Sequence, residues 1–142
     1  MRILLDTHVF LWMVYEPERL GALEPSLVDT GSQLVLSAVV TWELAIKQGL
    51  GRLGLPQPPG QLVTEQLSRL ALTPLVVDHR HAAAVADLPD HHRDPFDRML
   101  VAQAAVEELL LRRRTMPSRR TPSPNCARES TTSTPVPSAV RG

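Results

Sequence analysis

Three acidic residues stand at the edges of apolar segments, and their types and positions point to metal chemistry. Asp6 closes the N-terminal run RILLD, Glu43 lies in VVTWELAI, and Asp97 lies in DPFDRMLV. Elements that bury an apolar face rarely carry a carboxylate without a partner. If the fold draws these carboxylates together, they repel each other and lose water, and a divalent cation relieves both penalties. Because oxygen ligands suit hard ions, we expect Mg²⁺, with Mn²⁺ as the alternative.

Each acid also has a purely structural explanation. Asp6 could cap a helix, and Lys47, four residues after Glu43, could form an ion pair with it along one helix face. Asp94 precedes a proline that favours the first helical turn, so Asp94 is expected to be a helix N-cap. Asp97 lies deeper in that helix, on its apolar stripe, and a role in a site suits it better.

Strands that alternate with helices must position these acids. Short apolar runs predict three strands, at residues 2–5, 33–37 and 73–77. Helical patterns predict helices near residues 9–15, 38–48, 61–71, 79–88 and 96–111. This alternation predicts a parallel α/β sheet, which binds ligands at the carboxyl ends of its strands. Asp6 would lie at such an end.

The composition divides the chain into two parts. Its 142 residues, 43% of them hydrophobic, allow one domain with a real core. The formal net charge of zero hides an asymmetry, because residues 112–142 hold seven Arg and one Glu, with five Pro, five Ser and five Thr. Such a stretch buries too little apolar surface to order itself. We therefore predict a folded domain over residues 1–111 and a disordered basic tail over residues 112–142.

The composition also excludes some classes of protein. Cys126 is the single cysteine, so no internal disulfide and no Cys-rich zinc site can form, and a reducing cytoplasm fits. No run of apolar residues is long enough to predict a membrane-spanning helix. The start of the chain lacks the pattern of a signal peptide. These features predict a cytoplasmic protein.

The segments around the three acids resemble the PIN-domain family, and in particular the VapC-type toxins of bacterial toxin–antitoxin pairs. LLDTHVFLW is similar to the family's opening motif, LSAVVTWELAIKQGLGRLGLP to the segment that carries its helical Glu, and HRDPFDRMLVAQA to the segment that carries its third acid. The resemblance covers residues 1–110 or so. It implies a three-layer fold, with a central parallel sheet flanked by helices.

The same resemblance implies a function and a site. Asp6, Glu43 and Asp97 match the family's catalytic and metal-binding acids, and Asp94 is an auxiliary candidate ligand. The implied activity is that of a Mg²⁺-dependent endoribonuclease toxin, with RNA as substrate, a cognate antitoxin as partner and a homodimer as the assembly. His8 is more often structural. The cations expected to hold RNA near the site are Lys47, Arg52, Arg93 and Arg98.

The sequence departs from the family after Asp97. The family continues into another strand, which ends in a Thr-x-Asp-like turn with a fourth acid, whereas here VEELLL is followed by RRRTMPSRRTPSPN. We therefore expect one or more C-terminal strands to be missing, as a shifted reading frame would produce. Two alternatives stay open: a catalytically impaired PIN-like protein that keeps antitoxin binding or dimerisation, and a nucleic-acid binder that uses its basic tail.

Overall fold

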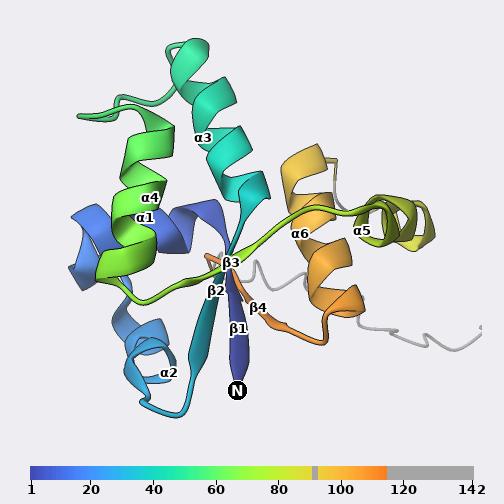
Figure 1. Cartoon of the computed structure of the whole chain (residues 1–142), viewed down its shortest axis with the longest axis horizontal. Coiled ribbons are helices and arrows are strands. Elements are labelled where there is room, and N and C mark those ends of the chain that lie inside the picture. Colours follow the sequence, from blue (N-terminus) through green and yellow to red (C-terminus); the bar gives the residue numbers. More distant parts are fainter. Residues whose placement is uncertain (91–92, 115–142) are drawn as a thin grey trace, which may run out of the picture.

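A computed structural model describes residues 1–90 and 93–114 of the chain. Figure 1 shows the described part as a sheet with helices on both sides. The strands are β1 (Arg2–Leu5), β2 (Gln33–Ser37), β3 (Thr73–Leu75) and β4 (Leu110–Arg112). The α-helices are α1 (Thr7–Tyr15), α2 (Glu24–Val28), α3 (Ala38–Gly49), α4 (Pro59–Arg69), α5 (His79–Ala84) and α6 (Pro95–Val106). Short 3₁₀ turns cover Pro17–Arg19, Gly21–Leu23 and Val85–Asp87.

The four strands are parallel and lie in the order β3-β2-β1-β4. Parallel neighbours need crossover connections, and the helices provide them. In Figure 1, α1, α2 and α4 lie on one side of the sheet and α5 and α6 on the other, while α3 extends beyond the carboxyl end of β2. The predicted α/β fold, with a parallel sheet between helices, is confirmed.

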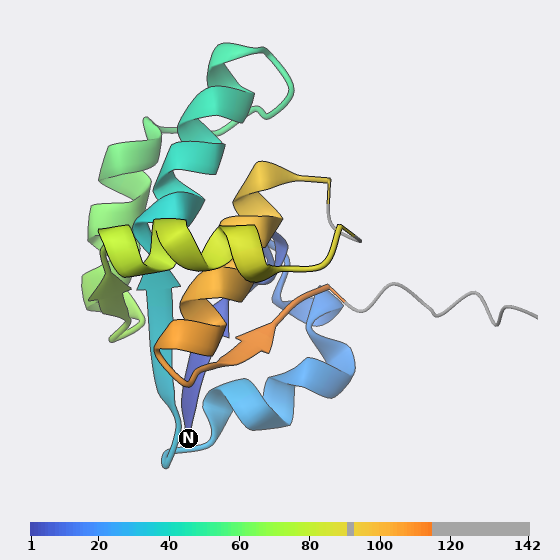
Figure 2. The same ribbon diagram turned by 90° about the vertical axis from the view of Figure 1, so that its right-hand side faces the viewer.

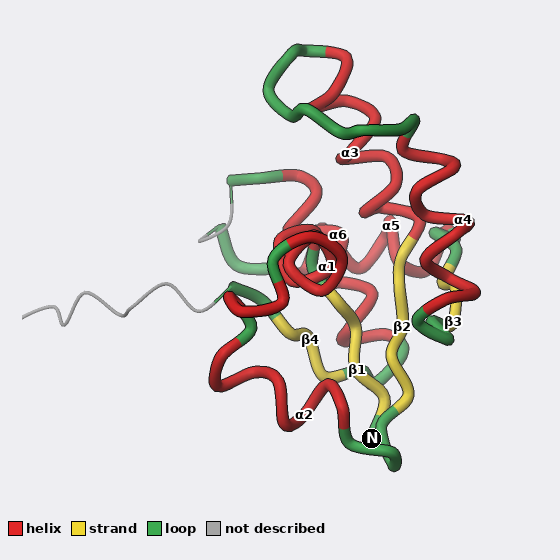
Figure 3. Tube along the Cα trace, turned by 90° about the vertical axis from the view of Figure 1, so that its left-hand side faces the viewer, coloured by secondary structure: helices red, strands yellow, loops and turns green. Residues whose placement is uncertain are grey.

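β1 is central because it is apolar on both faces. Ile3, Leu4 and Leu5 are each 0% exposed and belong to one continuous hydrophobic core. Their register pairs Leu5 with Leu36 of β2 on one side and with Arg112 of β4 on the other. The carboxyl ends of these three strands therefore meet at one edge of the sheet, as the tube in Figure 3 also shows.

The prediction that the helix starting near residue 96 continues to residue 111 is wrong. Helix α6 ends at Val106, and Glu108 adopts a left-handed conformation with φ of 53°. Leu109 then enters the core at 8% exposure, and residues 110–112 pair with β1 (Figure 2). The unpaired edge of β1 offers a ladder of backbone partners that outweighs local helix propensity.

The expectation that the strand after the long helix is missing is therefore also wrong, because β4 occupies that position. Arg112 is the last residue of β4, and the chain is described for two residues more. The predicted disorder of the rest of the tail, residues 115–142, falls outside the described residues. No helix in the described part of the chain is long and apolar enough to cross a membrane.

Candidate active site

Asp6 occupies the carboxyl end of β1, where it performs two local tasks. Its Oδ1 accepts a hydrogen bond from the N–H of Val9 at 2.7 Å and so caps α1. Its Oδ2 accepts from the N–H of Arg114 at 3.1 Å. Burial raises the pKa of the Asp6 carboxyl, and the two N–H groups oppose that shift only in part. The structural explanation for Asp6 is thus observed, and its carboxyl group still lies in a desolvated position.

Glu43 is held at the same edge of the sheet by α3. It is 5% exposed, and its Oε2 accepts a hydrogen bond from the hydroxyl of Thr7. Its Oε1 forms an ion pair with the ammonium group of Lys47. The expected pair between Glu43 and Lys47 is therefore present. A buried carboxylate needs such partners, because it has lost most of its water.

The two acids of α6 have different surroundings. Asp94 caps the helix, as the following proline predicts, by accepting from the N–H of Phe96 at 2.9 Å. Asp97 lies one turn further on and is partly buried. Its Oδ2 lies 3.3 Å from Nη1 of Arg113, the residue that follows β4. An arginine from the far end of the domain thus contacts the third predicted acid.

The three predicted acids line one cavity of about 380 Å³, and Asp94 lines it too. Thr7, His8 and Leu100 complete its wall, together with three arginines: Arg93, Arg113 and Arg114. Carboxylates from three separate elements therefore share one hollow at the carboxyl edge of the sheet. This is the position that the sequence predicted for a ligand site.

The other predicted cations have different places. Arg98 donates to the carbonyl oxygens of Val85 and Pro89, both at 3.0 Å, and so supports the chain before α6. Lys47 is not among the described residues that line the cavity, but it pairs with Glu43, which does line it. The hydroxyl of Ser37, at the end of β2, is 1% exposed, caps α3 and donates to Gln103 at 2.5 Å.

The donor set suits a hard divalent cation. The cavity offers carboxylate oxygens from β1, α3 and α6, and oxygen-only sites favour Mg²⁺ or Mn²⁺. Asp6 is partly buried and desolvation raises its pKa, which is the electrostatic situation that a cation relieves. Glu43 is 5% exposed and already paired with the ammonium group of Lys47. Asp6 accepts from backbone N–H groups, and the side chain of Asp97 is 27% exposed, so these two acids are the better placed direct ligands.

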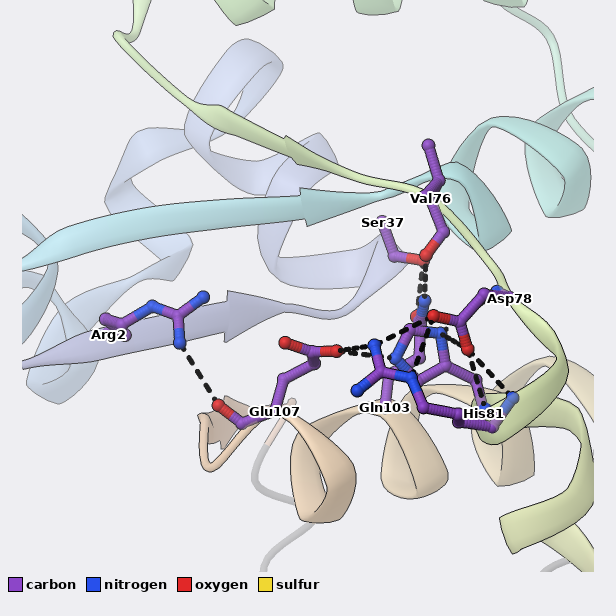
Figure 4. Close-up of polar contacts among 8 residues, drawn as sticks. Arg2, Ser37, Val76, Asp78, His81, Gln103 and Glu107 are labelled. Atoms are coloured by element: carbon purple, nitrogen blue, oxygen red, sulfur yellow. Dashed lines mark hydrogen bonds and ion pairs between the residues drawn. The ribbon is translucent and has the colours of Figure 1, made fainter.

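A second polar cluster links α5 to α6, and the sequence did not reveal it. Ligand atoms of Asp78, His81 and Glu107 all lie within 4.8 Å of one another (Figure 4). The N–H of Asp78 donates to Nδ1 of His81 at 3.1 Å, so Nε2 carries the proton and donates to Glu107 at 3.0 Å. Arg80 reaches both Asp78 and Glu107.

Because these groups satisfy one another, the cluster fits a structural role better than metal binding. The hydrogen bond from Arg80 is the main reason why the pKa of Asp78 falls to about 2. His81 is 1% exposed and closes a capping box with Asp78. Only tertiary packing brings Glu107 of the segment after α6 to this box. The cluster therefore fastens α5 to the end of α6.

The parallel sheet and its acidic edge cavity are what the resemblance in the sequence led us to expect. Residues 3–111 match the PIN domain family. The match covers well over half of the chain, and the chain belongs to this family.

The relatives that it resembles are more specific. The chain is 31% identical to ribonuclease VapC22 of Mycobacterium tuberculosis over 127 residues, which is 86% of this chain and 95% of that protein. It is 40% identical to ribonuclease VapC16 of the same organism over 55 residues, 39% of each chain. The match to VapC16 is thus to a part of that protein.

Solved structures agree on the fold. The complex of VapBC2 from Rickettsia felis with a promoter DNA fragment contains a chain that matches with a TM-score of 0.58 and 15% identity, over 78% of this chain and 85% of that one. DNA-bound VapBC from Salmonella typhimurium gives 0.55 and 20% identity, over 78% and 84%. At these identities the likeness supports the fold alone.

Proposed function

We propose that this protein is a metal-dependent endoribonuclease toxin of a toxin–antitoxin pair, with Mg²⁺ held by the carboxylate cavity. The observation that carries the proposal is the meeting of Asp6, Glu43 and Asp97 in one cavity of a PIN-family chain. Its similarity to ribonucleases VapC22 and VapC16 supports RNA as the substrate.

The residues divide the work as follows. Asp6 and Asp97 would hold the cation from the ends of β1 and α6, and Glu43, paired with Lys47, would form the third side of the site from its position on α3. The chemistry that Mg²⁺ would supply at this position is a coordinated water of lowered pKa and compensation of charge on the phosphate. Asp94 fixes the start of α6 as its cap, and so positions Asp97 three residues later.

The RNA backbone needs cations beside this acidic hollow. Arg93 lines the cavity and is a predicted phosphate contact. Its guanidinium group can bind a phosphate in bidentate fashion. Arg52 does not line the cavity, and Arg98 is engaged by backbone carbonyl groups, so neither is the preferred phosphate contact in this proposal.

An antitoxin partner and a homodimer are part of the proposal, together with a cytoplasmic location. The solved structures that share this fold are VapBC complexes from Rickettsia felis and Salmonella typhimurium, and this likeness supports a protein partner for this chain. On this chain, an apolar hollow of about 310 Å³ lies between α1 and the loop after α3, lined by Leu11, Tyr15, Leu53 and Leu55. A partner helix could place apolar side chains there. Trp42 is 52% exposed and packs edge-on against Phe96.

The test replaces each proposed ligand by its neutral isostere. Asp6→Asn and Asp97→Asn should each lower Mg²⁺-dependent cleavage of single-stranded RNA by at least ~100-fold, since each removes a charged ligand. Asp87→Asn is the matched control, because Asp87 is exposed and lies outside the cavity. Far-ultraviolet circular dichroism checks that each variant folds. Cleavage by both site variants at the rate of Asp87→Asn would reject the site.

A further inference from the structure

The end of β4 brings a fixed arginine into the acidic cavity. The N–H of Asp6 donates to the carbonyl oxygen of Arg112 at 3.0 Å, which extends the ladder by one step beyond the strand. The N–H of Arg114 then donates to the side chain of Asp6 at 3.1 Å. Arg113 lies between these two hydrogen bonds. Its backbone is therefore held on both sides by Asp6.

This anchoring directs the guanidinium group of Arg113 at Asp97. The two groups form an ion pair, with 3.3 Å between Nη1 and Oδ2. Their side chains are 33% and 27% exposed, so the ion pair is partly shielded from solvent. The guanidinium group of Arg113 thus already neutralises Asp97, the carboxylate that the proposed function assigns to the metal.

We propose that Arg113 is the built-in counter-ion of the cavity and competes with the divalent cation for Asp97. The inference rests on the proposed function, because it concerns the metal ligands of that site. The guanidinium group and a divalent cation repel each other beside the same carboxylate, so the ion pair opposes metal binding and is relieved when the guanidinium group moves away. The released guanidinium stays tethered within the cavity, where a phosphate of the RNA can take it up.

The neighbouring arginine provides a matched control. Arg114 lines the same cavity and carries the same charge, but in the described part of the chain its side chain has no carboxylate partner. Arg114 contacts Asp6 through its backbone N–H, and a side-chain substitution keeps that hydrogen bond. Arg113→Gln and Arg114→Gln therefore change the net charge equally, and only the first removes the ion pair.

The experiment measures Mn²⁺ affinity without RNA, by electron paramagnetic resonance of the free ion, in the full-length chain. Arg113→Gln should tighten the Kd for Mn²⁺ about 10-fold, the scale of one charge-assisted contact. Arg114→Gln should tighten the Kd for Mn²⁺ by ~2-fold or less, because it only removes one positive charge from the electrostatic field of the cavity. Arg113→Lys keeps a cation beside Asp97 and should stay close to the wild type.

Three results would overturn the competition. An unchanged Kd in Arg113→Gln means that the guanidinium does not hinder the metal. Equal tightening in Arg113→Gln and Arg114→Gln means that only the field of the cavity matters. In both cases metal binding by the wild type would leave the proposed function standing. If none of the proteins binds Mn²⁺, the proposed metal site fails together with the competition.

Discussion

Glu43 is a buried charge whose partners can be removed one at a time, and Lys47→Met is the most direct perturbation. Glu43 is 5% exposed, with the Thr7 hydroxyl on one carboxylate oxygen and the Lys47 ammonium on the other. Methionine keeps most of the aliphatic stem of lysine but has no charge. The variant therefore leaves a buried carboxylate with only its hydroxyl partner.

The size of the effect follows from the exposure of both partners. Removing one member of a fully buried ion pair costs about 3–5 kcal/mol. Here the side chain of Lys47 is 32% exposed, so water can reach the freed oxygen, and Thr7 still donates to the other. We expect a loss of about 1–2 kcal/mol in the free energy of unfolding. For a domain of this size, that loss lowers the Tm by roughly 4–10 °C.

The assay is equilibrium unfolding in urea, followed by circular dichroism in metal-free buffer. Arg69→Gln is the control for charge, because Arg69 is exposed at the end of α4 and has no partner among the described residues. The double variant Glu43→Gln/Lys47→Met removes both charges and should recover at least half of the lost stability. If Lys47→Met lies within ~0.5 kcal/mol of Arg69→Gln, the buried carboxylate does not depend on its lysine.

The remaining predictions concern the second polar cluster and the end of the chain. The pKa of Asp78 is lowered from 3.8 to about 2 in the folded protein, so its stabilising effect is present above the unfolded value and is lost as the pH falls through the folded one. Asp78→Asn should therefore flatten the acid-unfolding curve in that window, and an unchanged curve would mean that the contact with Arg80 has no net effect. Truncation after Arg114 should leave the Tm within ~2 °C of the full chain, because the removed segment is poor in apolar residues. Truncation after Arg112 should lower it further, since it also removes the contacts to Asp6 and Asp97. Equal Tm values for the two truncated chains, measured by calorimetry, would argue against those contacts.

The sequence by itself determined the elements whose signals lie in neighbouring residues, such as an apolar run or a proline. The apolar run before Asp6 predicts a buried strand, and the proline after Asp94 predicts the start of α6; both are present. The position of Asp6 at the carboxyl edge of a parallel sheet followed from the strand pattern. The expectation that Glu43 and Asp97 join it came from the resemblance of their segments to the PIN-domain family. The pair between Glu43 and Lys47 was predictable as well, since four residues along a helix bring two side chains together.

Tertiary structure decided the C-terminal end of the domain. The sequence of residues 107–112 has no local signal that separates a helix from a strand, and the free edge of β1 selected the strand. That choice carried Arg113 to Asp97 and Glu107 to His81, contacts that span many residues of the chain. Local propensity cannot encode such pairs, because they depend on the register between β1 and β4 and on the packing of α5 against α6.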